Sequence, residues 1–220
     1  MREVKDVSEG RSGEARIGVG PSVSETFLGD AFAGFLSEAP HATLKVTVSD
    51  NDLMVPALRR GELDLIINYS FSQSPEGTVF DPLYQLEHVV CASADHPLAK
   101  RTRISIKELA NEKWIWPDAT LLPQQRLREA FRDADLPAPK ASLQCRSVGI
   151  MLATVARSRA LTLIAKTTMN NVVQWNLKAL PIPELTWQRA IGVLRRDEAY
   201  TPPAIALLIR HLKRAAKSRY

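Results

Sequence analysis

Hydroxyl side chains stand near the N-terminus, where a strand pattern changes into a helix pattern. The stretch RIGVGPSVSETFLGD, residues 16–30, places Ser22 and Ser24 directly after Gly20-Pro21. A serine hydroxyl can donate to a polar ligand, and the free N–H groups of a helix start add partial positive charge. Serine is also a common N-cap. We expect Ser24 to cap the helix and Ser22 to contact a ligand, although capping and binding are compatible at either position.

A second polar turn, Ser49-Asp50-Asn51-Asp52, precedes another helix pattern. Asp50 or Asn51 is expected to cap this helix, and Asn51 is a candidate ligand contact. Two neighbouring carboxylates make the turn less favourable for an anion. If Asp50 faces the ligand, a group that bears a hydroxyl or an amine fits better than a bare carboxylate.

A third helix start, Arg146-Ser147-Val148-Gly149, follows a short strand pattern. Gly149 leaves room for close approach of a ligand to the backbone, although a glycine there can also be merely permissive. Arg146 and Lys166 could pair with an anion, but solvation at the surface is the simpler expectation for both. The sequence therefore places no arginine as a carboxylate clamp.

Aromatic and amide residues end two further strand patterns. In Trp114-Ile115-Trp116-Pro117, alternation puts Trp114 and Trp116 on one face; we expect Trp114 in the core and Trp116 with Pro117 near a ligand. Asn68 and Tyr69 follow the apolar run at 63–67, and both are candidate contacts.

Signatures of catalysis, metal binding and nucleotide binding are weak. Cys91 and Cys145 form no CxxC pair, and the four histidines are scattered, which argues against a zinc site. The serines have no GxSxG context, and Gly18-Val19-Gly20 lacks the third glycine of a dinucleotide motif. We expect no catalytic residue, no metal and no cofactor.

Length and composition are those of an ordinary globular protein. The 220 residues suffice for one large domain or two lobes, with 45% hydrophobic and 24% charged residues. The net charge of +5 is spread along the chain and is densest in RHLKRAAKSR, which is typical of a solvated helix end rather than of a DNA-binding face. A charged N-terminus, and the lack of any apolar run of about 18 residues, predict a cytoplasmic protein without a signal peptide or membrane span.

The elements that must position these residues alternate along the chain. A strand at 16–19, a helix at 25–39, a strand at 43–48, a helix ending at Arg60-Gly61 and a strand at 63–67 predict a parallel β-α-β-α-β unit. A second lobe and a return to the first are predicted by strands at 80–83, 87–92, 114–116, 141–145, 161–164, 179–181 and 187–194, by helices at 106–110, about 123–134, 148–158 and near 168–175, and by a last helix at 202–216. We expect a linker tail at 1–13, lobe I at 14–89 and 193–220, and lobe II at 90–192.

An α/β fold of this kind has two mostly parallel sheets flanked by helices and joined by two crossover strands. Ligands of open α/β sheets bind at the carboxyl ends of strands, and a cleft between lobes is the default ligand site.

Five stretches carry a resemblance to a known family: IGVG at 17–20, FLSEAPHATLKV at 35–46, LRRGELDLII at 58–67, ADHPLAK at 94–100 and CRSVGIMLATVARS at 145–158. In this order they resemble the effector-binding domain of LysR-type transcriptional regulators, which is similar to type 2 periplasmic binding proteins. The resemblance covers residues 14 to 216. It implies an excised effector domain, because the winged helix-turn-helix and linker helix of such regulators are not in this sequence.

The resemblance also assigns roles. Ser22 stands where the family often hydrogen-bonds an effector, Asn51 where a ligand-binding Thr or Ser is common, and Ser147 and Val148 where the cavity is lined. It implies a small-molecule inducer in the cleft between the lobes, and a homodimer or homotetramer formed through the helices near 25–38 and 123–134. DNA would be contacted only by the missing N-terminal domain. The alternative is a solute-binding protein of a transport system, which would be monomeric.

Overall fold

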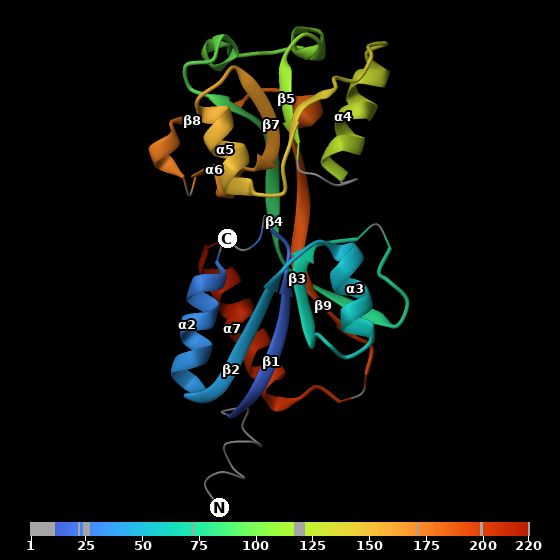
Figure 1. The fold of residues 1–220 in the computed structure, drawn as a ribbon, viewed down its shortest axis with the longest axis vertical. Helices are drawn as coiled ribbons and strands as arrows, with labels where there is room; N and C mark the ends of the chain where they lie inside the picture. The colour runs from blue at the N-terminus through green and yellow to red at the C-terminus, as the bar shows by residue number, and fades with distance from the viewer. Residues whose placement is uncertain are drawn as a thin grey trace, which may run out of the picture. The chain divides into compact units, whose positions relative to one another are not determined.

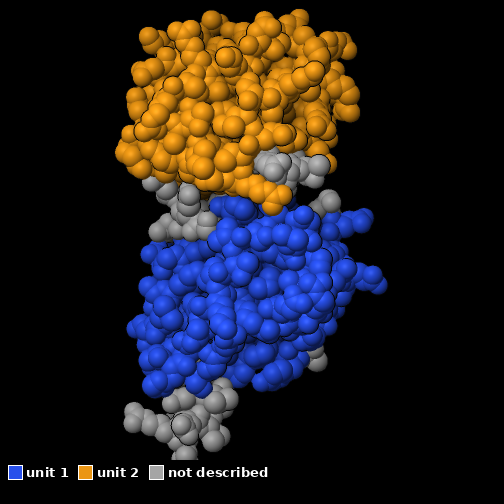
Figure 2. All heavy atoms as spheres, viewed as in Figure 1, with its two compact units in different colours: residues 1–85, 189–220 blue, residues 86–188 orange. Residues whose placement is uncertain are grey.

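A computed structural model describes residues 12–219 except residues 22, 24–26, 72, 117–121, 171 and 199. The chain forms two compact units, coloured separately in Figure 2: unit 1 is Met1–Gln85 with Arg189–Tyr220, and unit 2 is Leu86–Gln188. The sequence placed these boundaries after residues 89 and 192. No turn marks either boundary, because strands β4 (Thr78–Ser93) and β9 (Trp187–Arg196) run through them without a break.

The sheet of unit 1 has the order β2-β1-β3-β9. Strand β1 (Ser12–Val19) is parallel to β2 (His41–Val48) and to β3 (Leu65–Tyr69), whereas β3 is antiparallel to β9. Helices α2 (Leu28–Glu38) and α7 (Pro203–Arg219) pack on one face of the sheet and α3 (Asn51–Arg59) on the other (Figure 1). The predicted parallel β-α-β-α-β unit is confirmed.

Alternation along β3 divides the core of unit 1 between these faces. Ile66 packs with Met54 and Leu58 of α3, together with Leu194 of β9. Its neighbour Ile67 is also fully buried and, by alternation, points to the opposite face. A strand buried on both faces reads as a continuous apolar run, as Leu65-Ile66-Ile67 does. The strand continues to Tyr69, two residues beyond the predicted end at 67.

The sheet of unit 2 is built around β7 (Ala160–Ala165), which is antiparallel to β4 and parallel to β5 (Lys113–Trp116). Strand β6 (Ala141–Gln144) is parallel to β5, and β8 (Leu177–Leu180) is antiparallel to β4. The helices are α4 (Leu122–Asp133), α5 (Val148–Ala156) and α6 (Lys166–Asn170). Short 3-10 helices cover Pro97–Lys100, Ile106–Leu109, Val173–Trp175 and Pro183–Leu185.

Strand β5 shows the predicted alternation. Trp114 and Trp116 share one face and one core with Phe131 of α4, whereas Ile115 belongs to the core under α5 with Leu152. The two indole rings stack with centroids 5.0 Å apart and planes at 11°. The expectation that both tryptophans face the same side is confirmed.

Several predicted elements differ from the structure. The strands expected at 80–83 and 87–92 form the single strand β4, because buried Tyr84 and Leu86 with exposed Gln85 continue the alternation through the expected gap. The helix expected near 168–175 is instead α6 followed by a 3-10 turn. Helix α2 begins at Leu28, whereas the sequence predicted a start at residue 25. Phe27 occupies the N-cap position, but its side chain makes no capping hydrogen bond. The predicted cap, Ser24, lies outside the described residues.

Candidate functional site

Two asparagines meet at the carboxyl ends of the parallel strands of unit 1. Asn68 lies in β3, and Asn51 is the first residue of α3, which follows β2 after Ser49 and Asp50. The Nδ2 of Asn68 donates to Oδ1 of Asn51 at 2.7 Å, and the Oδ1 of Asn68 accepts from the Tyr69 N–H at 2.8 Å. The sequence singled out Asn51 and Asn68 separately, and the fold brings them into direct contact.

Gly20 completes this arrangement at the end of β1. Its N–H donates to the Ile67 carbonyl at 3.0 Å, which holds the ends of β1 and β3 together. A Cβ built on Gly20 would collide with the side-chain amide of Asn68. Only glycine leaves room for that amide, so Gly20, Asn51 and Asn68 form one unit, called here the strand-end cluster.

The cluster offers polar groups to a ligand. Both amides are partly buried, and within the described parts of the chain the Nδ2 of Asn51 donates to no other residue. Asp50 occupies the N-cap position of α3 by its backbone, but its side chain makes no cap hydrogen bond. An amide N–H beside a helix start suits an oxygen acceptor or a hydroxyl group.

Tyr69 has a cationic neighbour that the sequence did not predict. Cζ of Arg189 lies 4.7 Å from the centroid of the Tyr69 ring, and Nη2 of Arg189 donates to the Ser70 carbonyl at 2.9 Å. Tyr69 itself is buried, with 8% of its surface exposed. Burial lowers the pKa of the Arg189 guanidinium from its ordinary value. One feature of the sequence could have drawn attention to Arg189. It is a single arginine between Trp187-Gln188 and the apolar run AIGVL, at the point where the chain returns to unit 1.

The predicted residues of unit 2 gather at the start of α5. Ser147 is the N-cap, its Oγ accepting from the Ile150 N–H at 3.3 Å, and its side chain is exposed. Val148 is buried in the core with Leu152. A Cβ at Gly149 would meet only the Ser147 Oγ, at 3.9 Å, so packing within the described residues does not require glycine there.

Trp116 is almost fully buried, with 4% of its surface exposed. It also lines a cavity of about 300 Å³ in unit 2, together with Gln124, Arg128, Lys140 and Gln144. Its contact with Trp114 leaves only a small part of the ring for a ligand. The other predicted contacts, Ser22, Ser24 and Pro117, lie outside the described residues.

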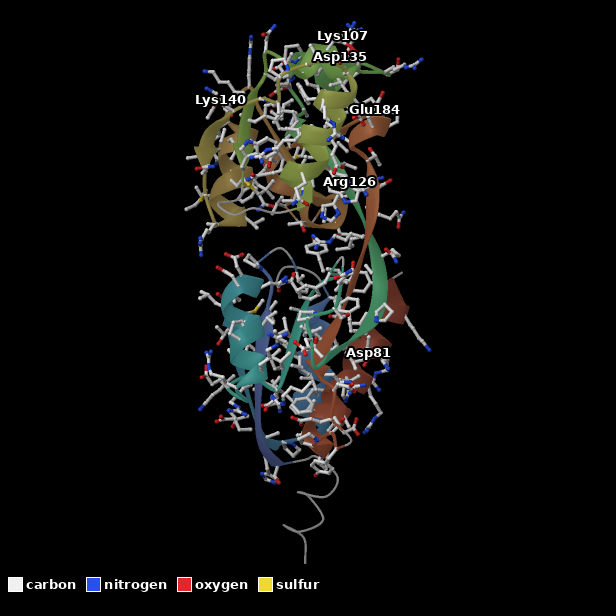
Figure 3. The ribbon with its side chains drawn as sticks, turned by 90° about the vertical axis from the view of Figure 1, so that its right-hand side faces the viewer. Asp81, Lys107, Arg126, Asp135, Lys140 and Glu184 are labelled. Atoms are coloured by element: carbon white, nitrogen blue, oxygen red, sulfur yellow. The ribbon has the colours of Figure 1, made fainter. Side chains whose placement is uncertain are left out.

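A larger cavity of unit 2 measures about 510 Å³ and was not predicted. Lys107, Arg126 and Glu184, labelled in Figure 3, are among its lining residues. Nη1 of Arg126 lies 3.9 Å from Oε2 of Glu129 in the same lining, so charges of both signs are already present. Such a lining indicates a solvated surface groove rather than a site for one class of ligand.

The two cysteines differ in environment. Cys91 is fully buried in β4, and burial raises the pKa of its thiol to about 12. Cys145 is partly exposed.

In the described ranges no group of three or more His, Cys, Asp and Glu residues could hold a metal ion. Across the same ranges, every helix is too short or too polar to cross a membrane.

Known proteins with a similar sequence are transcriptional regulators. GalR of Pseudomonas putida is 26% identical over 202 residues, covering 90% of this chain and 50% of GalR. PcaQ of Agrobacterium fabrum is 23% identical over 203 residues, covering 91% of this chain and 65% of PcaQ. The chain therefore spans only about half to two thirds of the length of these curated relatives.

Solved structures with the same fold include an effector-binding domain and a form of OxyR. The effector-binding domain of QuiR in complex with shikimate has a TM-score of 0.79 and 20% identity, covering 95% of this chain and 99% of that one. The reduced form of OxyR from N. meningitidis has a TM-score of 0.76 and 17% identity, covering 93% and 96%. The type 2 periplasmic-binding-protein-like fold expected from the resemblance is confirmed.

The family model of the LysR substrate binding domain matches residues 8–217, almost the whole chain. Together with the regulators of similar sequence, this match bears out the resemblance stated from the sequence. The chain belongs to the LysR substrate-binding domain family and is an effector-sensing regulatory domain.

Proposed function

We propose that this domain senses a small polar metabolite, and that the strand-end cluster of Gly20, Asn51 and Asn68 holds a polar group of that effector. The observation that carries the proposal is the hydrogen bond between Asn51 and Asn68, 2.7 Å long, at the carboxyl ends of parallel strands. Ligands of α/β folds bind at such strand ends. The collision predicted for any Cβ at Gly20 supports a cluster built around this pair of amides.

The chemistry of the cluster favours a hydroxyl or a similar neutral polar group at this end of the effector. Asn51 stands between Asp50 and Asp52 in the sequence, and two neighbouring carboxylates disfavour an anion at Asn51. The amide can donate to, and accept from, a hydroxyl group.

A second set of contacts is proposed at the start of α5. The exposed hydroxyl of Ser147 and the open space at Gly149 would admit a ligand group, with Val148 contributing through the part of its side chain that reaches the surface. Trp116, Pro117, Tyr69, Ser22 and Ser24 complete the set of contacts that we propose from the sequence.

In this proposal the domain is neither an enzyme nor a transport receptor. Effector binding would act through a homodimer or homotetramer, in the cytoplasm, on DNA bound by another part of a longer regulator. The regulators of similar sequence support this role, because the chain covers 50% and 65% of their lengths. An effector that prefers one arrangement of the domain by about 1–3 kcal/mol would provide the coupling.

The test is a thermal-shift screen of this chain with carboxylates, sulfonates, sugars, phenols and amines, followed by calorimetry of each hit. Asn51→Ala removes one amide, and we expect it to weaken a confirmed hit at least about tenfold, which equals about 1.4 kcal/mol. The matched control is Asn111→Ala, which changes an exposed asparagine in a turn of unit 2. Full affinity in Asn51→Ala would remove the cluster from the site, and a screen without any hit would contradict the sensing function.

A further inference from the structure

Arg189 lies at the start of the return to unit 1 and has no acidic partner in the described parts of the chain. Its one hydrogen bond there runs from Nη2 to the Ser70 carbonyl. The guanidinium lies over the Tyr69 ring, and Nε is buried and has no hydrogen-bond acceptor among the described residues. A buried donor without an acceptor calls for an explanation, and a bound ligand is one of the few available.

Several other arginines of unit 1 differ from Arg189 in their hydrogen-bond partners. Several of them meet a carboxylate side chain at hydrogen-bond distance. These pairs are Arg16 with Asp64 at 2.7 Å, Arg60 with Glu62 at 2.7 Å, Arg195 with Asp81 at 3.2 Å, and Arg196 with Glu198 at 2.7 Å. Arg59 and Arg214 also meet no carboxylate among the described residues, but both are exposed, whereas Arg189 is partly buried.

The surroundings of Arg189 strengthen its attraction for an anion. Removing a cation from water costs free energy, and contacts with an aromatic ring and a single neutral carbonyl offset only part of this desolvation cost. Desolvation also lowers the pKa of the guanidinium, and no carboxylate among the described residues opposes this effect. In such an environment a carboxylate that binds the guanidinium fork is held more firmly than it would be in water.

Arg189 is also close to the strand-end cluster along the sheet edge. The Ser70 N–H donates to the carbonyl of Ala190 at 2.8 Å, so Arg189 lies beside the carboxyl end of β3. Consecutive side chains alternate between the faces of a strand, so Asn68 points towards α3 and Tyr69 towards the other face, with Arg189 over its ring. A ligand that reaches both Asn68 and Arg189 would lie across the end of β3.

We infer that Arg189 anchors a carboxylate group of the effector, and that the effector is a small hydroxylated organic acid. The carboxylate accepts hydrogen bonds from the guanidinium, and the hydroxyl binds the amide of Asn51. This inference rests on the proposed function, because it names the chemical class that the same strand-end cluster receives.

A purely structural role makes different predictions. The bond to the Ser70 carbonyl connects β3 and β9, so Arg189 could act only as a clamp between these strands. A clamp contributes to stability and is indifferent to the charge of a ligand. An anion anchor changes the preference for charged over neutral ligands, which stability measurements do not report.

The experiment uses this chain with hydroxylated monocarboxylates, namely 3-hydroxybenzoate, shikimate and 3-hydroxybutyrate, and with the primary amide of each. Calorimetry compares the wild type with Arg189→Met, which keeps most of the apolar stem, and with Arg189→Lys, which keeps the charge but loses the fork. The matched control is Arg195→Met, which removes a charge from the same strand. Urea unfolding of every variant separates loss of stability from loss of binding.

We expect at least one carboxylate to bind the wild type about tenfold or more tightly than its amide. Arg189→Met should abolish this preference, Arg189→Lys should retain part of it, and Arg195→Met should retain it in full. If Arg189→Met does not fold, modification of arginines by phenylglyoxal, mapped by mass spectrometry, replaces it: the carboxylate should protect Arg189 in the wild type.

Each other result has a defined meaning. Amides that bind as tightly as carboxylates, a preference that survives in Arg189→Met, or a carboxylate that leaves Arg189 unprotected would overturn the inference and leave the proposed function standing. The same holds if only neutral compounds of the wider screen bind. If nothing binds, both the inference and the proposed function fail.

Discussion

At the scale of single residues, the site depends on one glycine as much as on the polar groups around it. The absent side chain of Gly20 makes room for the Asn68 amide, which in turn orients the amide of Asn51. Polar groups held by other protein groups need less reorganisation when a ligand arrives, and this lowers the cost of binding.

Gly20→Ala tests this dependence directly. The new Cβ meets the Asn68 amide, and we expect the free energy of unfolding to fall by about 1–3 kcal/mol in urea titrations. Gly29→Ala is the control, because a Cβ at this exposed helix position meets nothing within 4 Å. That variant should be stabilised by about 0.5–1 kcal/mol. Equal stability of the two variants would show that the cluster tolerates a side chain at Gly20.

Cys91 provides a prediction about pH. Burial raises its pKa to about 12 in the folded state, above the ordinary thiol value of 9.0, so the folded state favours the neutral thiol. The stability contribution of this group is complete below pH 9 and is lost as the pH rises towards 12. Over that window we expect the free energy of unfolding of the wild type to decrease relative to Cys91→Ala, by up to about 1.4 kcal/mol per pH unit. Parallel pH profiles of the two proteins would contradict the burial argument.

At the scale of elements, helix starts differ in how well local sequence predicts them. Helix α5 begins at the predicted residue because Ser147 caps it through its own hydroxyl. Helix α3 begins after Asp50, one of the two residues proposed as its cap, although the capping is by backbone alone. Helix α2 begins later than expected, at Leu28, directly after Phe27, whose ring packs in the core against Tyr84 with centroids 4.8 Å apart.

Gly149→Ala separates the two interpretations of the α5 start. Alanine fits the free space and the helical backbone, so the free energy of unfolding should rise by about 0.5–1 kcal/mol. If a ligand approaches the backbone there, as proposed, the affinity for a confirmed effector should fall although the protein is more stable. Unfolding and calorimetry on the same sample measure both, and unchanged affinity would exclude Gly149 from the site.

At the scale of the whole molecule, the structure sorts the apolar residues of the helices expected to form a dimer. Phe35 of α2 and Leu127 and Phe131 of α4 are buried inside their own units, whereas 47% of the surface of Leu36 is exposed. Only the exposed side chain is available to a second copy, and this distinction was not accessible from the helical pattern.

We therefore expect the chain to sediment as a dimer, and Leu36→Glu to sediment mainly as a monomer, because a carboxylate at a desolvated contact is costly. Leu53→Glu on α3 is the matched control, since Leu53 is 60% exposed and lies outside the two helices of the expected interface. Sedimentation velocity over a range of concentrations measures both. A monomeric wild type would instead agree with a transport receptor.

The sequence by itself determined the alternating elements, the parallel strands β1, β2 and β3, the shared face of Trp114 and Trp116, and the family. These features depend on side-chain periodicity and on ordered motifs, which are properties of neighbouring positions. The tertiary structure alone decided that Asn51 meets Asn68, that Gly20 must lack a side chain, and that Arg189 reaches Ser70 across 119 positions. Contacts of this kind follow from how strands pair and from which turns meet at a sheet edge. No local pattern around Arg189 records that its partner at the sheet edge is a neutral carbonyl and not a carboxylate.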